Sequence, residues 1–182
     1  MLFQKQELPL PGVYLLTPRK FEDDRGTFVK TFHAPEWKIL GLAFTEREAC
    51  YSTSQKNVLR GMHFQVPPAA HQKVVTCLHG AVLDVMLDLR KSSPTFGQAI
   101  GQELSAENPQ LLFLPIGIAH GFLARTDDSG MLYKTDHEYA PDHDAGLHWN
   151  SFNFNWGIDP ENVLCSSRDQ EHPRLEDVKS PF

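Results

Sequence analysis

The chain is short of cysteine, of positive charge and of long apolar runs, and each shortage excludes a class of protein. Its three cysteines are widely separated and form neither a zinc-binding pattern nor a disulfide framework, which favours a reducing compartment. The formal net charge of −6 gives no general attraction for nucleic acid or for an anionic membrane. No apolar run reaches the length of a membrane span, and the first residues are too polar for a signal peptide. We therefore expect a cytoplasmic protein that binds neither nucleic acid nor membrane.

The 182 residues are enough for one domain with a sizeable core, and the hydrophobic content of 41% is that of a globular protein. Helical periodicity is scarce, whereas turn residues recur about every 8–12 residues, a spacing typical of all-β domains. Short apolar or β-branched runs predict strands at residues 27–32, 58–65, 73–78, 82–88, 111–114, 121–125 and 131–135. One short helix is predicted at 35–41, between a proline and a glycine. We expect a single all-β sandwich or barrel over 1–182, irregular from about residue 150.

The densest group of chemically useful residues lies in the segment 59–65 and at Lys73. Arg60 and His63 share one predicted strand, and Lys73 follows His63 by ten residues. A neutral histidine beside two cations suits removal of a proton from carbon next to a carbonyl, with an anion bound nearby. The alternative is structural, because a lone strand histidine is commonly part of the framework and a strand-end lysine commonly reaches solvent.

A second histidine, His120, follows a Pro-x-Gly turn at residues 115–117. This arrangement resembles the second half of the cupin signature, in which the histidine often binds a metal. The first half requires a His-x-His pair with a nearby glutamate, whereas this chain offers only His63 and the more distant His71. Because a catalytic metal needs about three protein ligands, we expect no metal site in the barrel.

Other polar residues have both a functional and an ordinary interpretation. Tyr133 could donate a proton from its phenol, or it could be a buried aromatic whose hydroxyl is satisfied. Asp84 and Asp169 could each orient a histidine and raise its basicity, although a surface or capping role is more common. Arg25, in a predicted tight turn, could bind phosphate because the guanidinium fork matches phosphate oxygens, and Arg60 has the same potential.

Taken together, these segments resemble the dTDP-4-dehydrorhamnose 3,5-epimerases, which are cupin-fold enzymes of nucleotide-deoxysugar synthesis. The resemblance extends from about residue 12 to residue 177. It rests on residues 24–26, 59–65, 67–68, 72–73, 84–90, 93–97, 115–122 and 167–169. The combination is specific, whereas no single segment would be. It implies a cupin-type jelly-roll β-barrel with a few short helices.

The resemblance also implies a reaction, the inversion of C3 and C5 in a 4-keto-6-deoxyhexose, where both hydrogens are acidic because they are α to the keto group. By resemblance, His63 abstracts the proton and Asp169 is its carboxylate partner. Lys73 stabilises the enolate oxygen, and Tyr133 returns a proton to the opposite face. This chemistry requires no metal and no redox cofactor, so we expect no cofactor.

A further set of residues is expected to bind the nucleotide diphosphate or the sugar. These residues are Arg25, Lys30, Glu48, Arg60, His120, Tyr139, Asp144 and Arg168. Members of the family form homodimers that exchange N-terminal strands, and each subunit completes the partner's site. The resemblance therefore implies a homodimer in which Arg25 serves the neighbouring subunit.

The chain departs from the usual family pattern at three places. Residues 48–52 read Glu-Ala-Cys-Tyr-Ser instead of Gln-x-Asn-x-Ser, Lys30 stands where an acidic residue is common, and residues 150–154 lack the usual Asp-Asp-Pro. Glu48 removes hydrogen-bond donors and adds a charge, while Lys30 reverses one. The two changes could compensate as a pair, or they could adapt the pocket to another base.

We therefore predict an epimerase that converts dTDP-4-dehydro-6-deoxy-D-glucose to dTDP-4-dehydro-L-rhamnose, a precursor for lipopolysaccharide O-antigen. Within this class, a CDP- or GDP-linked substrate, or inversion at only one carbon, remains open. An isomerase that moves the keto group from C4 to C3 is a further alternative. From other classes, the alternatives are a non-catalytic sugar-binding cupin and a metal-dependent cupin oxygenase.

Overall fold

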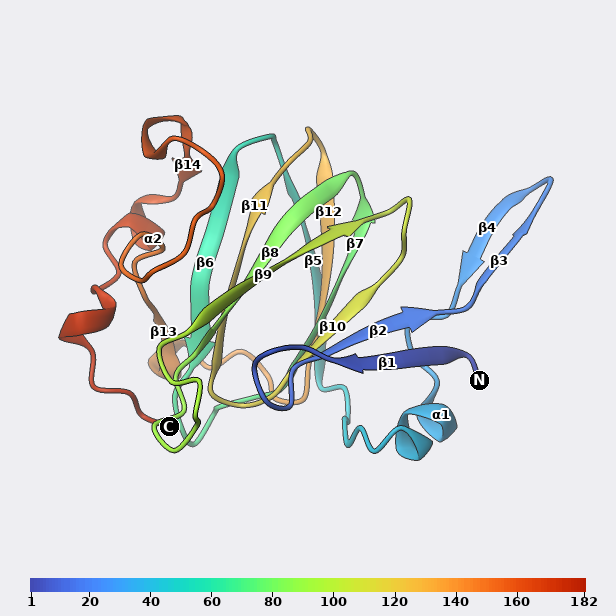
Figure 1. Ribbon diagram of the computed structural model, residues 1–182, viewed down its shortest axis with the longest axis horizontal. Helices are drawn as coiled ribbons and strands as arrows, with labels where there is room; N and C mark the ends of the chain where they lie inside the picture. The colour runs from blue at the N-terminus through green and yellow to red at the C-terminus, as the bar shows by residue number, and fades with distance from the viewer.

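Two β-sheets face each other and form an open barrel, from which a hairpin projects on one side (Figure 1). The computed structural model describes residues 1–182. The strands of the first sheet, in spatial order, are β1 (Phe3–Glu7), β2 (Tyr14–Pro18), β10 (Leu111–Leu114), β7 (Lys73–His79), β12 (Ser129–Thr135) and β5 (Glu48–Ser54). All neighbours in this sheet pair antiparallel. The all-β architecture predicted from the spacing of turns is confirmed.

The second sheet forms the opposite wall. Its strands, in spatial order, are β13 (Asp144–Gly146), β6 (Val58–Gln65), β11 (Ile118–Ala124), β8 (Ala81–Asp88) and β9 (Ala99–Ser105). A two-residue strand, β14 (Leu164–Cys165), runs parallel to β6. Two adjacent strands of this sheet, β6 and β11, carry the motifs that the sequence singled out around His63 and His120.

The remaining elements are short and lie outside the barrel (Figure 1). They are the hairpin β3 (Lys20–Asp23) and β4 (Gly26–Val29), helices α1 (Ala34–Ile39) and α2 (Ser167–Gln170), and single 3-10 turns η1 (Pro141–His143), η2 (Pro160–Asn162) and η3 (Leu175–Asp177). Helix α1 confirms the predicted helix: a proline lies in its first turn, and Gly41 follows its end with a φ of 74°. No helix in the structure has the length and apolar character required to cross a membrane.

All seven predicted strands are present, with ends that differ by up to three residues from the prediction. The sequence patterns did not predict β1, β2, β3, β5, β9, β13 and β14, of which β1, β5, β9 and β13 lie at the edges of the two large sheets. In β1 only Phe3 is buried, and in β5 only Ser54. An edge strand with one exposed face and polar residues produces little apolar periodicity, which explains these omissions.

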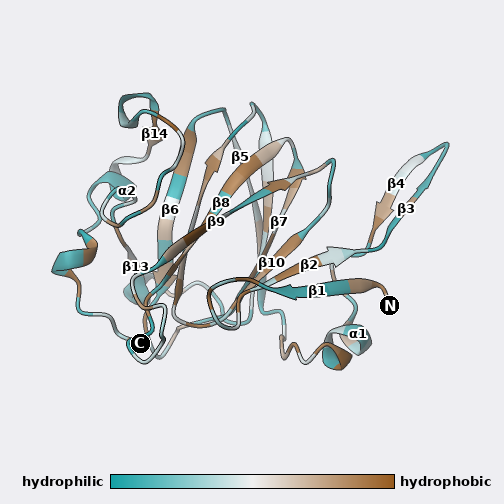
Figure 2. Cartoon of the chain, in the orientation of Figure 1, coloured by the Kyte–Doolittle hydropathy of each residue, from teal (hydrophilic) through white to brown (hydrophobic).

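The alternation of side chains along β8 divides the hydrophobic core into two layers. Val82 and Met86 point between the sheets, while Leu83, Val85 and Leu87 pack on the outer face of the second sheet. The outer layer is covered by the segment beyond residue 146, whose tryptophans belong to the same cluster. The barrel strands carry most of the hydrophobic residues, and α2 is hydrophilic (Figure 2). Both faces of β6, β11 and β8 are therefore packed, which gives the site a rigid wall.

Candidate active site

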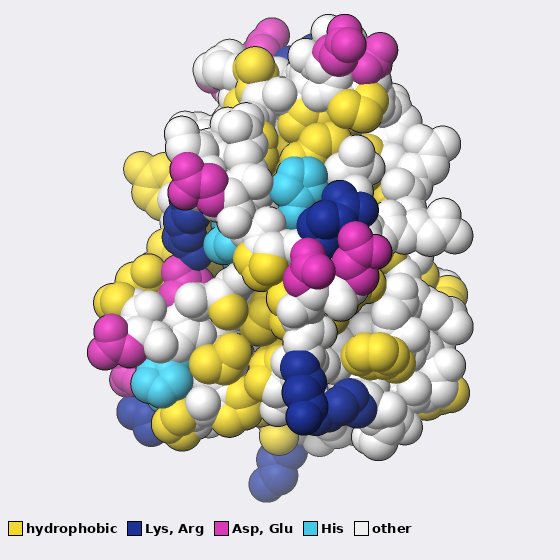
Figure 3. Space-filling view, turned by 90° about the vertical axis from the view of Figure 1, so that its left-hand side faces the viewer, with side chains coloured by type: hydrophobic (Ala, Val, Ile, Leu, Met, Phe, Trp, Pro, Cys, Tyr) yellow, Lys and Arg dark blue, Asp and Glu magenta, His cyan; other side chains and the backbone are white.

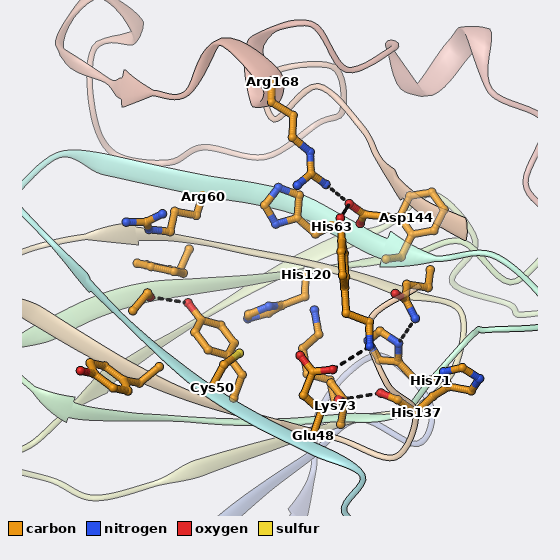
Figure 4. Close-up of a pocket in the computed structure, with 18 residues that line it drawn as sticks. Glu48, Cys50, Arg60, His63, His71, Lys73, His120, His137, Asp144 and Arg168 are labelled. Atoms are coloured by element: carbon orange, nitrogen blue, oxygen red, sulfur yellow. Dashed lines mark hydrogen bonds and ion pairs between the residues drawn. The ribbon is translucent and has the colours of Figure 1, made fainter. Parts of the chain in front are cut away.

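A cavity of about 310 Å³ lies between the two sheets and opens at one end of the barrel. The strands β5, β6, β7, β11 and β12 supply most of its lining, and loops around residues 71, 137 and 139 complete the mouth (Figure 4). The lining combines histidine, lysine, arginine and carboxylate side chains with aromatic rings. Such a concave site with a few convergent polar groups is the expected form of a small-molecule site.

A β-bulge in β6 places Arg60 and His63 on the same wall of this cavity. Their spacing of three residues would put them on opposite faces of a regular strand. In the structure Phe122 pairs with Arg60 and His120 with His63, so two residues of β6 oppose the single residue Gly121. The bulge depends on glycine, since a Cβ on Gly61 would lie 2.5 Å from the Cα of Gly121.

His63 is held by a carboxylate from the C-terminal helix α2. Its Nε2 lies 2.7 Å from Oδ1 of Asp169, and the other carboxylate oxygen accepts the backbone N–H of Gly61 at 3.2 Å. Burial would raise the pKa of Asp169, but these hydrogen bonds and the nearby histidine outweigh it and keep its pKa below the ordinary value. An ionised acceptor places the ring proton on Nε2, which leaves Nδ1 of His63 as the basic atom.

The opposite wall supplies an ammonium and a phenol. Lys73 begins β7 and Tyr133 lies in the adjacent strand β12, and both line the cavity from the first sheet. Burial lowers the pKa of Lys73 to about 8, against the opposing charge of Asp84. Burial also raises the pKa of Tyr133, whose hydroxyl is 3.0 Å from that of Ser52, so the phenol remains protonated. The cavity therefore holds a histidine–carboxylate pair on one wall, and an ammonium and a protonated phenol on the other.

His120 forms a second histidine–carboxylate pair, deeper in the barrel. Its Nε2 lies 2.8 Å from Oδ2 of Asp84, and both side chains are almost completely buried. Burial lowers the pKa of His120 and raises that of Asp84, while the hydrogen bond between them opposes both shifts. The expectation that Asp84 and Asp169 each orient a histidine agrees with this geometry.

Four of the expected substrate-binding residues lie at the mouth and form one network (Figure 4). The Tyr139 hydroxyl donates to Asp144 at 3.0 Å, and Arg168 forms an ion pair with the same carboxylate. Glu48 accepts the backbone N–H of Tyr139 at 2.7 Å. The carboxylate at position 48 thus has a structural role, because it fixes the loop that carries Tyr139.

Arg60 is also positioned within the cavity, whereas two other expected residues are not. Arg60 donates from Nε to Ser54 Oγ and from Nη2 to the carbonyl of Thr53, both at 3.1 Å. Arg25 and Lys30 lie on and just after the projecting hairpin, and neither lines the cavity of its own chain. Arg25 instead forms an ion pair with Asp23. Within one chain, Lys30 is therefore not placed to compensate the charge at position 48.

Several lining residues were not identified from the sequence. Gln65 donates to the carbonyl of Ala69 at 2.9 Å and accepts the N–H of Ala140 at 2.7 Å, which ties two mouth loops together. His71, whose pKa burial lowers to about 4, lies 3.1 Å from the same amide. Gln65 is buried and is the last residue of β6. Because it belongs to the 59–65 motif, the sequence could have indicated that it has a role in the site. Ser52 keeps the serine of the Gln-x-Asn-x-Ser pattern, but its contact with Tyr133 could not be predicted because it depends on pairing between distant strands.

The structure also brings three potential metal ligands together, although the sequence predicted no metal site. They are His63, Asp169 and His172, whose ligating atoms lie within 4.8 Å of one another. His172 follows α2 and was not identified in advance. The sequence could not indicate this group, because it depends on how the C-terminal segment packs against β6.

Comparison with known proteins identifies close relatives. The sequence model of the dTDP-4-dehydrorhamnose 3,5-epimerase family matches residues 7–177. The Escherichia coli (strain K12) dTDP-4-dehydrorhamnose 3,5-epimerase is 46% identical over 142 residues, which cover 78% of this chain and 77% of that protein. The Sulfolobus tokodaii epimerase structure is 35% identical, with a TM-score of 0.91 and 99% of both chains covered. A Legionella pneumophila enzyme in complex with dTDP-4-keto-L-rhamnose is 31% identical, with a TM-score of 0.92 and 97% and 95% coverage of this chain and that chain.

Proposed function

The chain belongs to the dTDP-4-dehydrorhamnose 3,5-epimerase family. We propose that one of its sheets supplies the base that removes a proton from the sugar, and that the other supplies the acid that returns a proton to the opposite face. The cupin-type jelly roll and the sugar-nucleotide epimerase activity expected from the resemblance are confirmed by the family and by the solved relatives. The substrate is a 4-keto-6-deoxyhexose linked to a nucleoside diphosphate, with dTDP-4-dehydro-6-deoxy-D-glucose as the main candidate.

The first half of the reaction is removal of a proton by His63. Its Nδ1 takes a hydrogen from the carbon next to the keto group, and the electron pair moves to the C4 oxygen as an enolate. Asp169 stabilises the imidazolium that forms, as its short hydrogen bond and low pKa allow. Lys73, on the opposite wall, supplies a positive charge for the enolate oxygen, where a partly buried cation acts more strongly than in water.

The second half of the reaction is reprotonation from the other wall. Tyr133 donates its phenolic proton to the carbon, and the enolate returns its electron pair to form the keto group again. Because Tyr133 and His63 project from different sheets, the new hydrogen arrives on the face opposite to the one that lost its proton. The phenolate and the imidazolium return to their starting states by proton exchange with solvent. No oxidation or reduction is involved.

The charged residues at the mouth and on the hairpin are proposed to bind the nucleotide diphosphate and the sugar. Arg60 and Arg168 offer guanidinium groups to the phosphates, and His120 lies near the sugar. We propose a cytoplasmic homodimer in which the projecting hairpin carries Arg25 and Lys30 to the partner's cavity. Support comes from the hairpin itself, which extends away from its own barrel (Figure 1). Its Phe28 is an exposed large hydrophobic side chain.

The observation that carries the proposal is the division of the catalytic groups between walls, with His63–Asp169 on one side and Lys73–Tyr133 on the other. The test is proton NMR of the purified enzyme with dTDP-4-dehydro-6-deoxy-D-glucose in heavy water. Loss of both the C3 and C5 signals supports a 3,5-epimerase, and loss of one indicates a mono-epimerase. Exchange only with CDP- or GDP-linked sugars would overturn the nucleotide assignment. No exchange with any of them would favour a non-catalytic cupin.

A further inference from the structure

His172 lies beside the His63–Asp169 pair and is not used by the proposed reaction. Its Nε2 is 3.7 Å from Oδ1 of Asp169, which is beyond hydrogen-bond range, and the ring centroids of His63 and His172 are 5.8 Å apart. The Nε2 atom is buried and has no hydrogen-bond partner, and its side chain is only 12% exposed. A buried polar atom without a partner is costly and calls for an explanation.

The imidazole of His172 packs in a space that exists because residue 146 is glycine and has no side chain. A Cβ on Gly146 would lie 2.3 Å from the Nε2 of His172, so the ring rests against the backbone of β13. The ring is thereby held next to the carboxylate of Asp169, with its unpartnered nitrogen in a fixed position. On the face of the molecule that carries the C-terminal segment, histidine, basic and acidic side chains lie side by side (Figure 3).

Two of the separations between these three side chains bracket the ligand spacing around a small divalent cation. Ligands at the usual 2.0–2.2 Å from a tetrahedral zinc ion are separated from one another by about 3.4 Å. The observed separations from Asp169 Oδ1 are 2.7 Å to His63 Nε2 and 3.7 Å to His172 Nε2, on either side of that value. Two imidazoles and one carboxylate are a frequent ligand set for zinc and other first-row transition metals, with further positions left for water.

We propose that His63, Asp169 and His172 bind a divalent first-row transition-metal ion, best matched by Zn²⁺, and that this ion inhibits the enzyme. The ion takes the lone pair of Nε2 in His63, where the ring proton resides in the free enzyme. A neutral ring must then carry its proton on Nδ1, which is the atom assigned as the base. Zinc therefore removes the base without displacing the side chain. The inhibition rests on the proposed role of His63, whereas the binding does not.

This site differs from the barrel metal site that the cupin signature would build. It shares only His63 with that signature, and its other ligands come from α2 and the turn after it. The cationic side chain on α2 is Arg168, whose charge would repel a metal ion. Arg168 forms an ion pair with Asp144, and this carboxylate offsets its positive charge. The metal is an inhibitor here, and the proposed reaction proceeds without it.

The binding test uses the full-length enzyme after chelator treatment, with Co²⁺ as the spectroscopic probe. We expect one Co²⁺ per chain, with the visible absorption of a four-coordinate ion, and displacement of this ion by Zn²⁺. His172→Ala should abolish the spectrum, and His172→Gln is the second variant if the alanine protein is poorly folded. His79→Ala is the matched control, because His79 lies exposed at the far end of β7, and it should bind Co²⁺ normally. A thiolate charge-transfer band would show that a cysteine binds the ion and would overturn the proposal.

The inhibition test measures deuterium exchange into the substrate as Zn²⁺ is added. The enzyme should lose activity, and a chelator should restore it. His172→Ala should keep the basal rate and require at least about tenfold more Zn²⁺ for the same inhibition. If Zn²⁺ inhibits the wild type and His172→Ala equally, the assignment is wrong. If Co²⁺ binds as expected but the enzyme has no exchange activity at all, the metal site stands and the proposed function fails.

Discussion

Replacement of Asp169 by asparagine tests the pairing on which the base depends. Asparagine has the same shape, and its oxygen can still accept the backbone N–H of Gly61. The amide NH₂ then faces Nε2 of His63, which must act as an acceptor and carry its proton on Nδ1. Asp169→Asn should therefore leave His63 in place with the wrong tautomer.

The size of the effect follows from two contributions. Loss of a hydrogen bond to a charged group is worth about 1.5–3 kcal/mol. At about 1.36 kcal/mol per decade this alone is roughly 10–100-fold. Loss of the correctly protonated base extends the range to about 10²–10⁴-fold in kcat. Because Asp169 touches His63 rather than the proposed substrate groups, KM should change little.

The assay is deuterium exchange at C3 and C5, followed by NMR over a range of substrate concentrations. Asp177→Asn is the matched control, since Asp177 is exposed in the same C-terminal segment, and it should keep the wild-type rate. The reasoning is refuted if Asp169→Asn retains a kcat within threefold of the wild type. A large rise in KM with unchanged kcat would instead make Asp169 a binding residue.

Three further changes have defined outcomes. His63→Ala should abolish exchange while dTDP binding, measured by calorimetry, stays close to the wild type; retained exchange would remove His63 as the base. Because burial lowers the pKa of Lys73 to about 8, its ammonium is lost above that pH, and kcat should fall as pH rises through about 8. In Lys73→Arg this alkaline fall should move to higher pH, whereas an unchanged profile would assign it to another group. Gly61→Ala should lower stability by about 1–3 kcal/mol in thermal unfolding, because its Cβ meets Gly121, and an unchanged melting temperature would mean that the bulge relaxes freely.

The sequence predicted the barrel and the central residues of the site because those features are local. The strand of residues 58–65 is apolar on one face and carries the motif with Arg60 and His63. Both the strand and its candidate functional residues could therefore be predicted from the sequence. The apolar run at residues 82–88 likewise predicted β8, and in the structure its Asp84 meets His120. A short strand that packs on both faces has a run of apolar residues in its own sequence, so it can be predicted without knowing its neighbours.

Other features could not be read from the sequence because they depend on contacts between distant segments. The bulge at Gly61 needs the close approach of Gly121, and without it Arg60 and His63 would not share a wall. The metal-capable group forms only when the C-terminal segment packs on β6 and brings His172 to Asp169. Glu48 was interpreted as a charge in the pocket, whereas its contact with the backbone of Tyr139 joins the start of β5 to a loop far along the chain.

The measurement that tests the central claim most directly is a comparison of exchange and inversion in Tyr133→Phe. The variant keeps His63, Asp169 and Lys73, so the base still removes the proton, but the wall opposite the base has no acid. The account predicts that deuterium still enters the substrate with retention, while formation of the inverted sugar falls by about 10²-fold or more. Equal loss of exchange and inversion, or no loss of inversion, would contradict the assignment of base and acid to opposite walls.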